Sequence, residues 1–251
     1  TTAYNFKSSQ HGADLFALRE PGNIYARLMN PTNDVLEKRL AQLDGGAAAL
    51  TLSSGTAAIY FAVTNILRQG DELVSANNLY GGTFTQFDAI LPQQGITVRF
   101  APVNDFAATE EAINEKTRAL YIETVGNPAL DVADIEGYAA IAKKHHLPLI
   151  VDATFTPPTL LRPIEHGANI VIHSLSKWIG GHGTGIGGVV VDAGNFDWTD
   201  PKFSLYNEPD RGYHGLRFAH DLGELNPLAF ILRLRTVGLR NQGPVSYTHL
   251  R

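Results

Sequence analysis

One lysine, Lys177, lies within a stretch of hydroxyl-bearing residues and glycines, HSLSKWIGGHGTGIGG, which runs from His173 to Gly188. The stretch comes directly after an apolar run at 170–172. A lone lysine is ordinarily a solvated surface residue, whereas glycines at this density indicate backbone that approaches another group closely. A lysine amine can also form a Schiff base with a carbonyl compound. The question is therefore which ligand this stretch holds.

Short apolar runs alternate with helical stretches along most of the chain. We expect strands at 73–75, 96–100, 119–123, 149–151, 169–173 and 188–191. We expect a helix in 31–46 that stops at Gly45, a second that opens at Ser54 and stops at Gly70, and further helices at 109–115 and 134–146. Strands apolar on both faces that alternate with helices are typical of a mainly parallel sheet in an α/β fold.

Polar residues follow several of these strands at the point where each strand ends. They are Glu123, Asp152 and Ser174, with Asn127 four residues beyond the first and Lys177 three beyond the last. In open α/β sheets, ligands bind outside the carboxyl ends of the strands. The sequence therefore predicts one site at this edge of the sheet.

Composition excludes several functions. The 251-residue chain has a net charge of −5 and no long basic run, so nucleic acid and anionic membranes are poor partners. It contains no cysteine, which excludes disulfides, thiolate catalysis and iron–sulfur clusters and fits a cytoplasmic location. No apolar run is long enough to span a bilayer, and the polar start does not resemble a signal peptide.

Two ligand classes fit poorly. Gly183, Gly185 and Gly188 match a GxGxxG pattern, but they precede a strand, whereas a dinucleotide fingerprint follows a strand and opens a helix. The histidines 145, 146, 173 and 182 do not show the spacing of a metal site, so we expect no metal. His145 and His146 more simply end a helix, where cationic side chains are favoured.

A phosphate-bearing aldehyde cofactor accounts for more of these residues than either alternative. Lys177 would form the Schiff base, and Asp152 would keep a pyridine nitrogen protonated so that the ring accepts electrons. Tyr80, in NNLYGGT, is a candidate to stack on that ring. Each residue alone has a structural explanation: Asp152 could cap a turn and Tyr80 could pack in the core.

The phosphate of such a cofactor also has candidate ligands. Backbone N–H groups at a helix N-terminus bind phosphate, and Gly55 and Thr56 after Ser54 offer this arrangement. The hydroxyls of Ser174 and Ser176 could add to it, although serines at a helix start can be simple caps. An arginine can hold a phosphate bidentately, and Arg27 in NIYARLMNPT is a candidate.

Six motifs occur in an order that resembles a known family. They are YARLMNPT, SSGTAA, YGGT, ETVGNP, VDATF and HSLSKWIGGHG. The chain resembles the Cys/Met-metabolism (transsulfuration) family of pyridoxal-phosphate enzymes from about Leu15 to Gly243. The flanking sequences look most like the O-acetylhomoserine sulfhydrylase branch. The resemblance implies a fold-type I aminotransferase-like large domain.

The resemblance also implies roles for the individual residues. Lys177 would carry pyridoxal 5'-phosphate covalently and move protons, with Asp152 on the pyridine nitrogen and Tyr80 on the ring face. The remaining cofactor-binding positions would be Tyr25, Arg27, Ser54, Gly55, Thr56, Asn127, Ser174 and Ser176. Tyr25 and Arg27 would come from the neighbouring subunit, so the site would need a homo-oligomer, a dimer of dimers. The role of Glu123 stays open, and pairing with a buried cation is one possibility.

The implied reaction is γ-replacement on O-acetyl-L-homoserine with sulfide or methanethiol, which gives homocysteine or methionine in methionine biosynthesis. Cystathionine γ-synthase, cystathionine γ-lyase and methionine γ-lyase belong to the same family and remain alternatives. A cofactor-binding fragment without activity is a further alternative.

We divide the chain into an N-terminal arm (1–30) that we expect to be extended, a cofactor-binding large domain (31–243) and a non-native tail (244–251). In the family, a C-terminal small domain follows the large domain and supplies an arginine for the substrate carboxylate. We expect that domain to be absent here, and the chain as written to bind cofactor but to turn over poorly.

Overall fold

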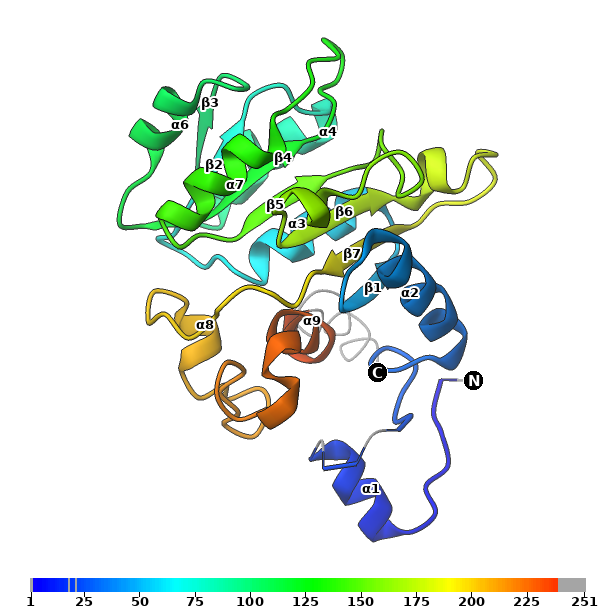
Figure 1. Ribbon diagram of the computed structural model, residues 1–251. Helices are drawn as coiled ribbons and strands as arrows, with labels where there is room; N and C mark the ends of the chain where they lie inside the picture. Colours follow the sequence, from blue (N-terminus) through cyan, green and yellow to red (C-terminus); the bar gives the residue numbers. More distant parts are fainter. Residues whose placement is uncertain (1, 18, 21, 239–251) are drawn as a thin grey trace.

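A single seven-stranded sheet organises the computed structural model, which describes residues 2–17, 19–20 and 22–238 (Figure 1). The strands are β1 (Ala48–Leu52), β2 (Glu72–Ala76), β3 (Thr97–Ala101), β4 (Thr117–Glu123), β5 (Leu149–Asp152), β6 (Ile170–Ser174) and β7 (Gly188–Asp192). Their order in the sheet is β1-β7-β6-β5-β4-β2-β3. The six predicted strands are confirmed within two residues at each end, and β1 was missed.

The sheet is mainly parallel, as predicted. Strands β2 to β6 run parallel, and β7 pairs antiparallel with both β6 and β1. The glycine-rich stretch after Lys177 therefore turns the chain back beside the strand it has just left. The carboxyl ends of β4, β5 and β6 meet at one edge of the sheet.

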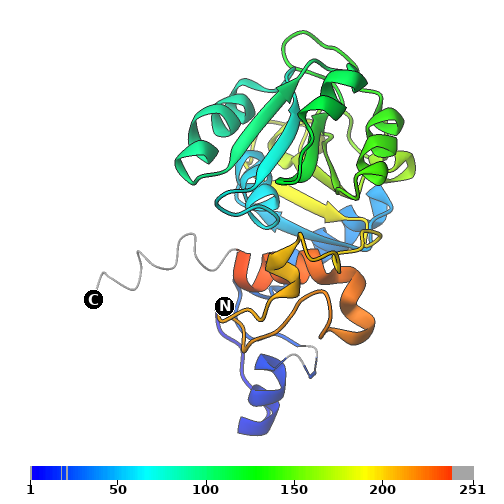
Figure 2. The same ribbon diagram turned by 90° about the vertical axis from the view of Figure 1, so that its left-hand side faces the viewer.

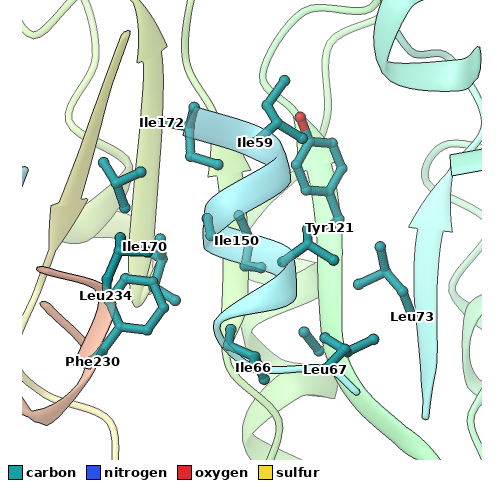
Figure 3. Close-up of a cluster of buried hydrophobic side chains, with 14 of the residues drawn as sticks. Ile59, Ile66, Leu67, Leu73, Tyr121, Ile150, Ile170, Ile172, Phe230 and Leu234 are labelled. Atoms are coloured by element: carbon teal, nitrogen blue, oxygen red, sulfur yellow. The ribbon is translucent and has the colours of Figure 1, made fainter. Parts of the chain in front are cut away.

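Helices cover both faces of the sheet. Helix α3 (Gly55–Thr64) lies on one face, and Figure 3 shows its Ile59 between Tyr121 and Ile172 of the strands, with Ile150 in the same cluster. On the other face, α2 (Pro31–Asp44) and α7 (Ile135–Lys144) cover the alternate side chains, such as Val151. Because side chains alternate along a strand, each strand buries apolar residues on both faces, which explains its continuous apolar run.

Polar caps fix where the helices begin and end. The side chain of Asn30 accepts a hydrogen bond from Thr32 N at the start of α2, and Gly45 ends that helix with a φ of 75°. Asp134 caps α7, and His145 directly follows its last residue, as expected. Asp105 caps α6 (Phe106–Ala112), so this helix begins three residues before the predicted one.

The second predicted helix is too long at its C-terminal end. Helix α3 ends at Thr64, six residues before Gly70. The guanidinium of Arg233 donates to both the carbonyl oxygen (3.0 Å) and Oδ1 (2.7 Å) of Asn65, and the Tyr206 hydroxyl also donates to that carbonyl. These contacts occupy the carbonyl of the residue after α3, so a distant part of the chain fixes where the helix ends.

The arm is not extended throughout, contrary to the prediction. Helix α1 (Ser9–Phe16) lies within it, because the Ser8 side chain accepts from His11 N (3.1 Å) and Leu15 is buried. Figures 1 and 2 place the arm at the same end of the molecule as α8 (Ser204–Asn207) and α9 (Ala229–Arg233). The division into arm and large domain stays a prediction, and the predicted tail lies outside the described residues.

Short elements complete the described chain. They are α4 (Gly81–Thr85), η1 (Gln86–Ile90), α5 (Leu91–Gln93), η2 (Pro163–His166), η3 (Leu175–Ile179), η4 (Gly223–Leu228) and η5 (Leu234–Gly238). Within the described ranges, no helix has both the length and the apolar character needed to cross a membrane.

Candidate functional site

A cavity of about 410 Å³ opens at the carboxyl ends of β4, β5 and β6. Nine of the eleven predicted site residues line it: Ser54, Gly55, Thr56, Tyr80, Asn127, Asp152, Ser174, Ser176 and Lys177. Glu123, whose role the sequence left open, also lies on its wall. Tyr25 and Arg27 are not among the lining residues. The structure thus brings together segments that are up to 123 residues apart, counted from Ser54 to Lys177.

Three strand-end residues form the floor of the cavity in a fixed order. Asp152 on β5 lies between Ser174 on β6 and Glu123 on β4. The strand register pairs Glu123 with Asp152. Each follows by two residues a core side chain that faces α3, so all three side chains point to the α3 face. The alternation of a parallel sheet therefore places a hydroxyl and two carboxylates side by side.

Asp152 is held by the residue two positions further along the chain. Its Oδ1 accepts hydrogen bonds from the backbone N (2.9 Å) and Oγ1 (2.6 Å) of Thr154. Its Oδ2 lies 3.4 Å from the Tyr121 hydroxyl. Burial raises the pKa of Asp152 above its ordinary value, and the Thr154 hydrogen bonds act in the opposite direction. A cation in the cavity would restore its ionised form.

Glu123 is the second buried carboxylate on the wall. Its side chain is 4% exposed, and Oε1 accepts a hydrogen bond from the backbone N of Tyr80 at 2.9 Å. Burial, and then the neighbouring charge of Asp152, raise the pKa of Glu123 to about 8. At neutral pH the protonated form of Glu123 is therefore favoured, next to a second acid whose pKa is also raised.

The N-terminus of α3 forms another wall. Ser54 caps this helix by accepting from Ala57 N (3.0 Å), and Gly55 and Thr56 contribute its first turn. A Cβ on Gly55 would lie 2.5 Å from the Cβ of Ser174, so only glycine allows α3 to approach β6 this closely. The first-turn N–H groups and the Ser174 hydroxyl therefore border the same space.

Ser176 and Lys177 follow β6 within the turn η3. The Ser176 Oγ accepts from Gly187 N at 3.1 Å, which joins the outgoing chain to the returning one. Lys177 is exposed, and its side chain lines the cavity. Its amine can therefore reach a ligand bound there.

Tyr80 and Asn127 come from the loops that follow β2 and β4. Tyr80 immediately precedes α4, and its side chain is 49% exposed, so much of the ring is open to solvent or to a ligand. Asn127 is half-buried, and its backbone N donates to Asn78 O at 3.3 Å. This contact ties the loop after β4 to the loop that carries Tyr80.

Tyr25 and Arg27 lie on the arm, away from this cavity. Tyr25 is exposed and forms an isolated bridge with Ala3. The Nη1 atom of Arg27 is buried and makes no hydrogen bond with the described part of the chain. Their predicted role in a neighbouring subunit's site stays a prediction.

Sequence reasoning missed two features of the cavity. Thr154 links two predicted residues, because it donates to Asp152 and its Oγ1 accepts from Ser174 N (2.8 Å). The spacing Asp-x-Thr, in which side chains bond locally, was the available signal. The other feature is an apolar part of the lining made by Phe155, Trp178 and Ile186. No periodicity marks these three positions.

The four histidines considered as metal ligands have other contacts. His173 is fully buried between Asp44 Oδ2 (2.9 Å) and the carbonyl of Ala153 (3.1 Å), and His146 contacts the carbonyl of Asp197. His182 contacts the carbonyl of Gly180, and His145 Nε2 lies 3.5 Å from Glu110 Oε1. Over the described ranges, no group of three or more potential ligand side chains is arranged to hold a metal ion.

The donor set of the cavity fits pyridoxal phosphate. The α3 N-terminus with its serine hydroxyls suits a phosphate, the buried carboxylates suit a protonated pyridine nitrogen, and the Lys177 amine suits an aldehyde. Because Gly55 lies so close to Ser174, the α3 N-terminus and the Ser174 hydroxyl can contact the same phosphate. These groups define the candidate cofactor site of an α/β enzyme.

Comparison with known proteins places the chain in a family. Residues 1–236 match the family described as Cys/Met metabolism PLP-dependent enzyme, so the chain belongs to that family. The chain is 52% identical over 249 residues to an O-acetyl-L-homoserine sulfhydrylase of Thermus thermophilus, and 49% identical over 249 residues to one of Leptospira meyeri. It is 49% identical over 246 residues to a homocysteine synthase of Schizosaccharomyces pombe.

These alignments cover 97% of this chain and 56–58% of the relatives, so the chain spans little more than half their length. A solved structure from Campylobacter jejuni superposes with a TM-score of 0.84 at 36% identity, over 95% of this chain and 64% of the other. It is described as a putative O-acetylhomoserine (thiol)-lyase that carries N'-pyridoxyl-lysine-5'-monophosphate. The fold class and the family's dependence on pyridoxal phosphate are thereby confirmed.

Proposed function

We propose that this chain supplies the cofactor-binding site of an O-acetylhomoserine sulfhydrylase, which replaces the acetate of O-acetyl-L-homoserine with sulfide or methanethiol. The observation that carries the proposal is the convergence of Lys177, Asp152 and the α3 N-terminus on one cavity. The names of the relatives support the choice of substrate.

In this proposal the cofactor-binding residues contact three parts of the cofactor: its phosphate, its pyridine nitrogen and its ring. Gly55 and Thr56, with the serines that line the cavity, bind the phosphate. Asp152 pairs with the pyridine nitrogen, and Asn127 borders the cofactor ring. When bound, pyridoxal phosphate supplies an electron sink for negative charge at the substrate Cα.

Lys177 carries the proton transfers. Its Nζ would hold the cofactor through the aldehyde and, once released by substrate, would take the proton from the substrate Cα and return one as the product leaves. Tyr80 covers one face of the ring and orients it. The side chains of Phe155 and Trp178 give this side of the cavity an apolar lining.

We further propose a homo-oligomer, a dimer of dimers, in which Tyr25 and Arg27 reach the phosphate of a neighbouring subunit. The Nη1 of Arg27 lacks a hydrogen-bond acceptor in the described chain, but it is buried, so the side chain would have to turn outward to reach that phosphate. The cytoplasmic location expected from the sequence remains a prediction.

The first test is the visible absorbance of the purified protein mixed with pyridoxal phosphate, beside a Lys177→Ala variant. We expect a band that depends on Lys177. Products then define the reaction: homocysteine from O-acetylhomoserine and sulfide supports the proposal. A 2-oxo acid with ammonia would indicate a γ-lyase, and cystathionine would indicate a γ-synthase.

A further inference from the structure

Glu123 is a buried acid on the cavity wall to which the proposed reaction assigns no role. In the described part of the chain it forms no ion pair, and the groups that act on its pKa include no cation. Burial of a carboxyl group without a cation is costly unless hydrogen bonds satisfy its oxygens. Its contacts therefore show what it does.

The contact that stands out runs from Glu123 to the loop that carries Tyr80. Oε1 of Glu123 accepts from Tyr80 N at 2.9 Å across a separation of 43 residues. Tyr80 precedes α4 and has no side-chain hydrogen bond that caps this helix. The carboxylate thus fixes the Tyr80 backbone N–H at the point where the loop turns into the helix.

The Tyr80 ring itself has little support from the protein. Its side chain is 49% exposed, and the ring lies against Gly82 of its own loop, on which a Cβ would come within 2.5 Å of Tyr80 Cε1. The position of the ring therefore depends on its backbone. The Tyr80 N–H bond to Glu123 is the contact that joins this backbone to the rigid end of β4.

We propose that Glu123 is a positioning residue that holds the backbone of Tyr80, and through it the ring, in place over the cofactor site. This inference rests on the proposed function for the ring's role, but the contact itself exists without cofactor. The role requires an oxygen acceptor at position 123. It does not require a negative charge.

Two variants separate the acceptor from the charge. Glu123→Gln keeps an oxygen of the same reach and removes the charge, whereas Glu123→Ala removes both. We expect amide hydrogen exchange of the segment containing Tyr80, measured without cofactor, to become about tenfold faster or more in Glu123→Ala. In Glu123→Gln we expect it to stay near the parent rate.

Cofactor affinity provides the second measurement. We expect Glu123→Ala to weaken binding of pyridoxal phosphate by up to about tenfold, the upper end expected for loss of one uncharged hydrogen bond, and Glu123→Gln to restore most of it. In a Tyr80→Ala background, Glu123→Ala should have little further effect, because the two residues act through one contact.

Three results would overturn the proposal. They are equal exchange rates in all variants, a Glu123→Gln variant as impaired as Glu123→Ala, and additive effects of Glu123→Ala and Tyr80→Ala on affinity. If the parent shows no Lys177-dependent absorbance band, the proposed function fails. The exchange measurement then decides the positioning role by itself.

Discussion

Glu123 and Asp152 lie at the same level of two neighbouring parallel strands, and their carboxylates are held by different loops. Glu123 accepts from Tyr80 N and Asp152 accepts from Thr154, so each acid has its own donor. Burial raises the pKa of both groups. Two adjacent buried acids ionise together only at high cost. A protonated pyridine nitrogen paired with Asp152 would relieve that cost.

This pair predicts a pH dependence of stability in the protein without cofactor. The pKa of Glu123 is about 8 in the folded chain against an ordinary value of 4.5. Between these values the folded state keeps a proton that the unfolded state has lost, so the free energy of unfolding falls as pH rises. Glu123→Gln has no such proton. The stability of this variant relative to the parent should therefore grow by up to about 1.4 kcal/mol per pH unit in this window.

Urea unfolding at several pH values from 5 to 8 measures this difference. The groups facing Glu123 are Asp152, Tyr121, the Thr83 hydroxyl and the Tyr80 backbone. Glu111→Gln, at an exposed position on α6, is the control and should run parallel to the parent. If the free energy of unfolding of Glu123→Gln also changes with pH in parallel with the parent, Glu123 is already ionised in the folded chain near pH 5 and the prediction is wrong.

Asp152→Asn should weaken cofactor binding by about tenfold or more, because it removes the charge proposed to pair with the pyridine nitrogen. Titration of the visible absorbance with pyridoxal phosphate measures the dissociation constant. The matched control is Asp192→Asn, which changes another buried carboxylate at the end of β7, outside the cavity. Equal affinities in the two variants would contradict the assignment of Asp152.

The sequence predicted the cavity floor because two simple rules suffice for it. Continuous apolar runs mark buried parallel strands, and the ends of such strands meet at one edge, so Asp152 and Ser174 could be placed together. The glycine-rich stretch likewise indicated a close backbone approach, and a Cβ on Gly188 would overlap the carbonyl oxygen of Ser54. These are local patterns, and local patterns are readable in one sequence.

Contacts between distant segments could not be predicted in this way. The bond between Glu123 and Tyr80 spans 43 residues, and the contact of Arg233 that accompanies the end of α3 spans 168. The short helix α1 carries too few apolar residues for a clear period, and only its Ser8 cap marked it. Tertiary contacts decided these elements.

Gly55→Ala should reduce both stability and cofactor affinity. The added Cβ would lie 2.5 Å from Ser174 Cβ, so α3 must move away from β6 and its N-terminal N–H groups move with it. Overpacking of this kind costs roughly 1–3 kcal/mol. Thermal unfolding and cofactor titration measure the two effects. Gly185→Ala, where a Cβ meets no atom within 4 Å and φ is not positive, is the control and should bind cofactor like the parent.

Thr154→Val should damage the site although Thr154 was not among the predicted residues. Its hydroxyl donates to Asp152 Oδ1 at 2.6 Å and accepts from Ser174 N at 2.8 Å, so it joins two residues of the cavity floor. Valine has the same shape but leaves the Ser174 N–H without this acceptor, which costs about 1–3 kcal/mol of stability. Asp152 also loses a donor that lowers its pKa, so its protonated form should persist to higher pH.

Thr154→Ser is the matched control, because it keeps the hydroxyl and removes only a methyl group. We expect Thr154→Val to weaken cofactor binding and to shift the pH at which binding is half lost upward, while Thr154→Ser stays close to the parent. Cofactor titrations from pH 5 to 9 measure this shift. If both variants lose affinity equally and the pH of half-binding does not shift, the effect comes from the packing of the methyl group. The hydroxyl link between Asp152 and Ser174 then has no role in cofactor binding.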